Sequence, residues 1–171
     1  MKTKKTNTSP EPLGDRAATT PTPGQTTPLH RILVVDNDIS IRQLQAEVLV
    51  HSGYQVDAAA DGAAAWEILN ANSYDLLITD HEMPKLTGVE LLKKLRAARM
   101  ALPAILLSEA IPEEELSPHP SLHPAATLLK PFTADELLLA VKEVLRATVG
   151  AREMIAAANL QNQPPAGGWR V

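Results

Sequence analysis

The sequence lacks cysteine, and this absence excludes a disulfide-stabilised scaffold, a thiolate metal site and a cysteine nucleophile. It also lacks a long hydrophobic run, because the longest uncharged apolar stretch, residues 100–107, has eight residues. A membrane-spanning helix needs about 20. The basic N-terminus is not followed by the apolar segment of a secretory signal. We therefore expect a cytoplasmic protein that does not insert into a membrane.

Basic charge is scarce in the middle of the chain. Residues 31–149 carry 10 basic and 17 acidic side chains, whereas residues 1–30 and 150–171 have net charges of +2 and +1. Surfaces that bind nucleic acid are basic. We therefore expect no contact with DNA, and we expect the partners to be proteins.

The two ends of the chain differ in composition from its middle. Residues 1–30 hold five prolines and eight threonines with almost no large apolar side chains, and such a segment cannot offset the entropy of becoming ordered. We expect it to be disordered. Residues 150–171 are expected to form a tail, partly helical and then disordered, with residues 159–171 unstructured. This tail is too short for an output domain, so the expected folded domain is residues 31–149.

Short apolar runs alternate with helical periodicities across this domain. The runs favour buried strands over residues 32–35, 54–58, 75–79, 104–107 and 127–129. The helical patterns lie at residues 40–51, 62–70, 89–99 and 133–149. We predict an α/β fold in which a five-stranded parallel sheet is doubly wound, with helices on both faces. Because four prolines interrupt residues 111–124, the fourth helix is predicted to be shortened to about one turn near 113–116.

Two of the helices have well-defined apolar faces in the sequence. In the first helix the apolar residues at helical spacing are Ile41, Leu44, Val48 and Leu49. In the last helix the apolar stripe is formed by Leu137, Val141, Val144 and Leu145. At the start of the last helix, Thr133 and Glu136 have the spacing of a capping box.

Polar residues follow four of the predicted strands. Asp36, Asn37 and Asp38 come after the first strand, and the others are followed by Asp80, Ser108 and Lys130. Ligands of open α/β sheets bind at the carboxyl ends of the strands. Two neighbouring carboxylates repel unless a cation neutralises them, and Mg²⁺ prefers such oxygen ligands. The set therefore predicts a magnesium-assisted phosphoryl-transfer site with an aspartate nucleophile.

The motifs around these residues resemble the receiver domain of two-component response regulators, of the single-domain, chemotaxis-regulator type. The matching segments are VVDND (34–38), LLITDHEMPKLTG (76–88), ILLS (105–108) and LLKPF (128–132). The resemblance covers about residues 31–149 and implies a flavodoxin-like sheet with strand order 2-1-3-4-5. It also implies that Gly88 permits the loop conformation after Met83 and Pro84.

The resemblance assigns a role to each residue of the site. Asp80 falls at the phosphoacceptor position, and Asp36 falls at an acidic position that helps to hold Mg²⁺. The backbone carbonyl of Glu82 is another implied metal ligand. Ser108 falls at the position of the switch hydroxyl. Lys130 falls at the lysine that pairs with a phosphoryl oxygen, and its bond to the following proline is expected to be cis.

The sequence departs from the family pattern at three places. Asn37 occupies the second acidic position, where its amide oxygen can bind Mg²⁺ but brings no negative charge, so weaker metal binding is expected. Asp38 is expected to point elsewhere. Thr127 stands where the family often has an aromatic residue, which indicates a different readout of phosphorylation. The proline-rich segment replaces a regular fourth helix.

These features leave three interpretations of the function. In the leading one, a sensor histidine kinase or phosphotransfer protein phosphorylates Asp80, and the modified surface signals to a downstream protein. Such a switch is not an enzyme beyond its own phosphorylation and dephosphorylation. In the second, the chain is a pseudo-receiver that binds proteins without being phosphorylated. In the third, it is a haloacid-dehalogenase-like phosphatase with Asp36 as nucleophile and Asp38 as acid/base.

Overall fold

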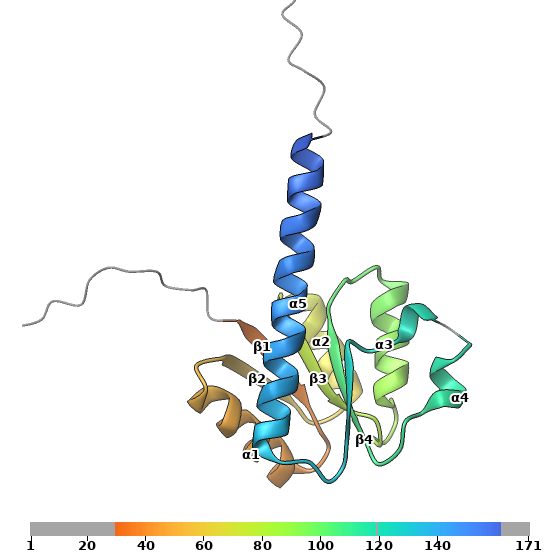
Figure 1. Cartoon of the computed structure of the whole chain (residues 1–171). Helices are drawn as coiled ribbons and strands as arrows, with labels where there is room; N and C mark the ends of the chain where they lie inside the picture. The colour runs from red at the N-terminus through yellow and green to blue at the C-terminus, as the bar shows by residue number, and fades with distance from the viewer. Residues whose placement is uncertain (1–29, 119, 162–171) are drawn as a thin grey trace, which may run out of the picture.

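A computed structural model describes residues 30–118 and 120–161 of the chain. Five parallel strands form one sheet in the order β2-β1-β3-β4-β5 (Figure 1). The strands are β1 (Arg31–Val35), β2 (Gln55–Ala59), β3 (Leu76–Asp80), β4 (Ala104–Ser108) and β5 (Ala126–Leu129). The predicted fold class and strand order are therefore confirmed.

The helices cover both faces of this sheet. They are α1 (Ile39–His51), α2 (Gly62–Ala71), α3 (Gly88–Ala97), α4 (Glu113–Leu116) and α5 (Ala134–Gln161), with a 3-10 turn η1 (Pro120–Leu122) before β5. Leu33 and Leu77 point to one face and pack with α2 and α3. Ile32 and Ile78 point to the other face and pack with α1 and α5. This alternation follows from the two-residue period of a strand.

The register of the strands brings the ends of β1 and β3 together. Val35 pairs with Thr79, and Asp80 pairs with Leu107 of β4. The residue that follows β1, Asp36, therefore lies beside the last residue of β3. This edge of the sheet is where the sequence places its polar side chains.

The fourth helix is as short as the prolines predict. α4 has four residues, and η1 supplies a second short turn after it. Leu116 and Leu122 from these turns are buried against Val89 and Leu106. The irregular segment therefore still closes the core beside β4.

The first helix packs differently from its predicted apolar face. Its buried residues are Gln45 and Leu49, whereas Ile41 and Leu44 are 40% and 58% exposed. The helical spacing of these two residues therefore does not place them in the core. The reason is that α1 starts at the carboxyl edge of the sheet, so that Ile41 and Leu44 line an open groove beside Phe132 instead of the core.

The last helix begins as predicted and ends later. Thr133 and Glu136 form the expected reciprocal hydrogen bonds at its start, and its four predicted core residues are buried. The helix then continues past residue 149 to Gln161 and projects from the domain (Figure 1). The prediction that residues 159–161 are unstructured is wrong, because residues 151–158 are rich in alanine, the best helix former, and no proline intervenes.

Residues 1–29 and 162–171 lie outside the part of the chain that the structure describes. The expected disorder of these two segments therefore stays a prediction. Within residues 30–118 and 120–161, the helices are all too short or too polar to span a membrane.

Candidate functional site

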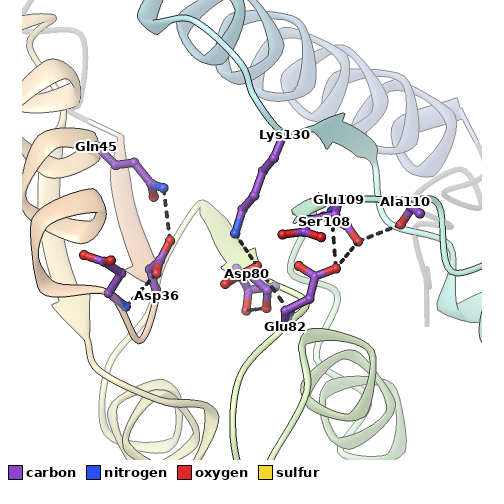
Figure 2. A network of polar contacts seen from close by, with 10 residues as sticks. Asp36, Gln45, Asp80, Glu82, Ser108, Glu109, Ala110 and Lys130 are labelled. Atoms are coloured by element: carbon purple, nitrogen blue, oxygen red, sulfur yellow. Dashed lines mark hydrogen bonds and ion pairs between the residues drawn. The ribbon is translucent and has the colours of Figure 1, made fainter.

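The polar residues after β1, β3, β4 and β5 converge at the carboxyl edge of the sheet (Figure 2). Asp36, Asp80 and Ser108 are almost completely buried, with 1%, 3% and 0% of their surfaces exposed. Lys130 reaches into the same place from β5. Buried ionisable groups at the end of a parallel sheet are typical of a functional site.

Asp80 and Lys130 form the central ion pair of the site. The Lys130 Nζ donates a hydrogen bond of 2.9 Å to Asp80 Oδ1, and the backbone N–H of Glu82 donates one of 3.2 Å to the same oxygen. Burial lowers the pKa of Lys130, but its hydrogen bond to Asp80 and the surrounding carboxylates outweigh this and raise the pKa above its usual value. The lysine is therefore charged at neutral pH. The Lys130–Pro131 bond is cis, as expected.

Asp36 is held by groups from the start of α1. Its Oδ1 accepts a hydrogen bond of 2.9 Å from the backbone N–H of Asp38, and its Oδ2 accepts one of 3.3 Å from Gln45 Nε2. Burial raises the pKa of the Asp36 carboxyl, and the charge of Asp80 raises it further against the opposing effect of the Asp38 hydrogen bond. An ionised Asp36 is thus unfavourable in this pocket unless a cation is nearby.

Ser108 is turned toward the side chain of Glu82. Its hydroxyl lies 2.7 Å from Glu82 Oε1 and 2.6 Å from the carbonyl oxygen of Ala110, and its single proton can be donated to one of them at a time. The backbone N–H of Glu109 also donates to Glu82 Oε1, at 3.2 Å. Burial works against the charge of Glu82, but the hydrogen bond from Ser108 and its other partners lower the pKa of this carboxyl.

The side-chain contacts of Glu82 and Gln45 were not foreseen from the sequence. The resemblance assigned only the backbone carbonyl of Glu82. Gln45 lies on an otherwise apolar face of α1. A polar residue at such a position in the sequence could have indicated its contact with the site.

Asn37 and Asp38 lie at the solvent side of the site. Asn37 is exposed, and its side chain makes no hydrogen bond with the described part of the chain. Asp38 caps α1 by accepting hydrogen bonds from the backbone N–H groups of Ser40 and Ile41, at 2.8 and 3.2 Å. It therefore points away from Asp36, as expected.

Gly88 allows α3 to approach the site closely. A methyl group at this position would lie 2.5 Å from the carbonyl oxygen of Asp80 and 2.8 Å from the Leu106 side chain. Its φ is not in the left-handed region. Gly88 thus permits the loop after β3 to lie close to α3 through the space it leaves, and not through a left-handed backbone conformation.

The donor set of the site suits a small divalent cation. Asp36 and Asp80 offer buried carboxylates, and Lys130 is paired with Asp80. The backbone carbonyl of Glu82 accepts no backbone hydrogen bond from the described residues. Oxygen ligands of this kind fit Mg²⁺. Within residues 30–118 and 120–161, no three His, Cys, Asp or Glu side chains gather as a metal cluster. The residue after Asp36 is an asparagine, Asn37.

Comparison with known proteins identifies the family. Residues 32–142 match the family described as the response regulator receiver domain. This chain belongs to the response regulator receiver family. The phosphatase interpretation is thereby set aside.

Several response regulators are similar to this receiver domain in sequence. Response regulator MprA of Mycobacterium ulcerans (strain Agy99) is 35% identical over 118 residues, which cover 69% of this chain and 51% of that protein. The chain spans about half the length of the curated relatives it matches.

Solved receiver domains are similar to it in structure. The chemotaxis response regulator CheY4 of Vibrio cholerae has a TM-score of 0.62 and 31% identity, covering 68% of this chain and 98% of that one. The response regulator TrrA of Thermotoga maritima, solved in complex with Mg²⁺-BeF, has a TM-score of 0.61 and 34% identity, covering 68% and 99%. Receiver domains are signalling modules rather than enzymes in the usual sense.

Proposed function

We propose that this receiver domain accepts a phosphoryl group on Asp80 from a sensor histidine kinase or phosphotransfer protein and signals through protein–protein contact. The observation that carries the proposal is the 2.9 Å pair between Lys130 Nζ and Asp80 Oδ1 at the buried end of β3. This pair fixes the carboxylate beside a cation suited to a phosphoryl oxygen.

The transfer needs one free carboxylate oxygen. Lys130 and the N–H of Glu82 both engage Asp80 Oδ1, and within the described residues no hydrogen bond engages Oδ2. Oδ2 is therefore the proposed nucleophile. Its lone pair forms the new O–P bond while the P–N bond of a phosphohistidine donor breaks, and the imidazole nitrogen keeps the bonding electrons.

Mg²⁺ is the proposed cofactor, held by Asp36, Asn37, Asp80 and the backbone carbonyl of Glu82. When bound, it would neutralise the charge that develops between the carboxylate and the phosphoryl oxygens. The amide of Asn37 contributes no charge, so the affinity for Mg²⁺ should be lower than with aspartate at this position. Similarity to TrrA, solved in complex with Mg²⁺-BeF, supports this cofactor.

The readout is proposed to begin at Ser108. Its hydroxyl must leave Glu82 before it can donate to a phosphoryl oxygen on Asp80. Such a rearrangement would change the loop that follows β4 and with it the surface offered to a downstream protein. The expectation that this chain makes no contact with DNA stays a prediction, because its relatives are about twice as long.

The pseudo-receiver is the second candidate. Asn37 in the second acidic position favours it, since the site then has one carboxylate fewer to bind Mg²⁺. In that case the same surface would bind a protein partner constitutively.

Intact-mass spectrometry after incubation with acetyl phosphate and Mg²⁺ separates the two candidates. We expect one added phosphoryl group on the native chain, no addition on Asp80→Asn, and faster labelling of Asn37→Asp. Labelling of Asn37→Asp alone would instead favour the pseudo-receiver. Labelling that persists in Asp80→Asn would contradict Asp80 as the acceptor.

A further inference from the structure

Gln45 is a polar residue on the buried side of α1. It is 3% exposed, and it shares the buried face of the helix with Leu49, which lies four residues later. Burying an amide is unfavourable unless its groups are hydrogen-bonded. An apolar side chain would fill the same place without that penalty, so packing does not account for Gln45.

The one hydrogen bond of the Gln45 side chain within the described residues is made to Asp36. Its Nε2 donates to Asp36 Oδ2 at 3.3 Å, and its Oε1 is buried without a partner there. The opposite orientation of the amide would set two acceptor oxygens against each other. The carboxylate therefore fixes the amide with the N–H groups toward Asp36, as Figure 2 shows.

This contact completes the support of the Asp36 carboxylate. Oδ1 is held by the backbone N–H of Asp38 at 2.9 Å, and Oδ2 is held by Gln45. Each carboxylate oxygen has a second lone pair, so both remain able to bind a cation. Hydrogen bonds of this kind orient metal-binding carboxylates and strengthen metal binding.

Because Asn37 is neutral, Mg²⁺ binding should depend more on Asp36 than it would with an acidic residue at position 37. With an amide in the second acidic position, Asp36 and Asp80 are the two carboxylates among the proposed Mg²⁺ ligands, and Asp80 is already paired with Lys130. We infer that Gln45 is a positioning residue for Mg²⁺, which holds the Asp36 carboxylate in the orientation that binds the ion. The inference rests on the proposed Mg²⁺ site.

The test compares two glutamines of the same helix. Gln45→Met keeps the length of the side chain and removes the amide, and Gln43→Met makes the same change at an exposed position. Mg²⁺ is titrated into the full chain while the backbone amide signals of residues 36–38 and 80–82 are followed by NMR. We expect the dissociation constant to rise about tenfold in Gln45→Met and to stay unchanged in Gln43→Met.

A second readout separates positioning from folding. Without metal, the thermal midpoint of Gln45→Met should stay close to that of the native chain, because the lost hydrogen bond is offset by removal of a buried, unpartnered oxygen. Gln45→Leu serves the same purpose if Gln45→Met does not fold.

The outcomes distinguish this inference from the proposed function. If the native chain binds Mg²⁺ and Gln45→Met binds it equally well or more tightly, the role of Gln45 is wrong and the proposed function stands. If the native chain does not bind Mg²⁺, the proposed metal site and the role of Gln45 both fail. Weaker binding in both methionine variants would also contradict a specific role for Gln45.

Discussion

The two edges of the sheet differ in how completely their acidic side chains are paired with cationic and hydrogen-bonding groups. Toward the amino edge, Asp57 in the middle of β2 accepts hydrogen bonds from Arg31 at 2.7 and 3.0 Å and from the Tyr74 hydroxyl at 2.7 Å. Asp75 there accepts from the backbone N–H of Arg31 and lies 3.8 Å from Arg152 of α5. Each acid at this edge therefore has cationic and hydrogen-bonding partners.

The carboxyl edge is left with an excess of negative charge. Asp36, Asp80 and Glu82 gather there around Lys130, and the guanidinium of Arg42 reaches only the backbone carbonyl of Asp36. The pKa values reflect the contrast: burial raises that of Asp36, whereas the hydrogen bond from Tyr74 lowers that of Asp57. The paired charges near the amino edge stabilise the fold. The excess of negative charge at the carboxyl edge is typical of a site that binds a ligand.

The largest expected effect follows from removing the cation that is paired with Asp80. Lys130→Ala should slow phosphorylation of Asp80 by acetyl phosphate about 100-fold or more, because Lys130 is the positive group bonded to the Asp80 carboxylate in the described part of the chain. Lys142→Ala, at an exposed position of α5, should leave the rate unchanged. Time courses of intact mass measure both, and equal rates in Lys130→Ala and the native chain would contradict the role of the lysine.

A pair of glycines tests how closely the two edges are packed. Gly88→Ala should lower the free energy of unfolding by about 1–3 kcal/mol, because the new methyl group meets the Asp80 carbonyl. Gly150→Ala lies within α5 with no atom in reach, and it should raise the free energy of unfolding by up to about 1 kcal/mol. Urea denaturation provides the values, and a loss at both positions would refute the contrast.

A change at Glu82 tests whether the hydrogen bond between Ser108 and Glu82 slows phosphorylation of Asp80. Glu82→Gln should speed phosphorylation by acetyl phosphate about 3–10-fold, since it removes a negative charge near an anionic donor and weakens the hold on the hydroxyl. In a Ser108→Ala background the gain should shrink to the part due to charge. An identical gain in both backgrounds would show that the hydroxyl is not restrained.

The smallest effect is a difference in pH dependence between Asp57 and Asp36. Because its folded pKa is lowered, Asp57 stabilises the fold above the usual carboxyl pKa of about 3.9, and this is lost as pH falls through the folded value. Asp36 has the opposite sign, since its folded pKa is raised and its contribution is lost as pH rises through it.

The corresponding asparagine variants make this difference measurable. Asp57→Asn should be less stable than the native chain at pH 7, by no more than about 1 kcal/mol for a partly exposed pair. Asp36→Asn should be more stable at pH 7, and both differences should fade at pH 3. Urea denaturation at the two pH values is the measurement, with the exposed Glu67→Gln as control; two shifts of the same sign would be inconsistent with the contrast.

The parts of the molecule that the sequence predicted well depend on local patterns. Strands buried on both faces read as continuous apolar runs, and parallel pairing brings their ends together, so the convergence of Asp36 with Asp80 followed from position alone. The capping box of α5 is equally local. Prolines likewise predicted the short α4.

The parts that were missed depend on tertiary distances. Ile41 and Leu44 have helical spacing, but periodicity does not say how much of a helix faces the sheet. The contact from Ser108 to Glu82 joins the end of β4 to the loop after β3, 26 residues away in the chain, and no sequence pattern encodes it. The motif identified Gly88, but the reason for a glycine at this position became clear only from its distance to Asp80.

The projecting end of α5 has a mechanical consequence. Its first half is packed on the sheet by Val141 and Leu145, and Arg152 approaches Asp75 at the amino edge. Beyond that point the helix continues to Gln161, which is about 14 Å farther at 1.5 Å per residue. If the helix behaves as a rigid rod, a tilt of about 10° about the position of Arg152 moves its end at Gln161 by about 2 Å. A small change in packing beneath α5 would therefore displace its end outside the domain, far from the carboxyl edge of the sheet.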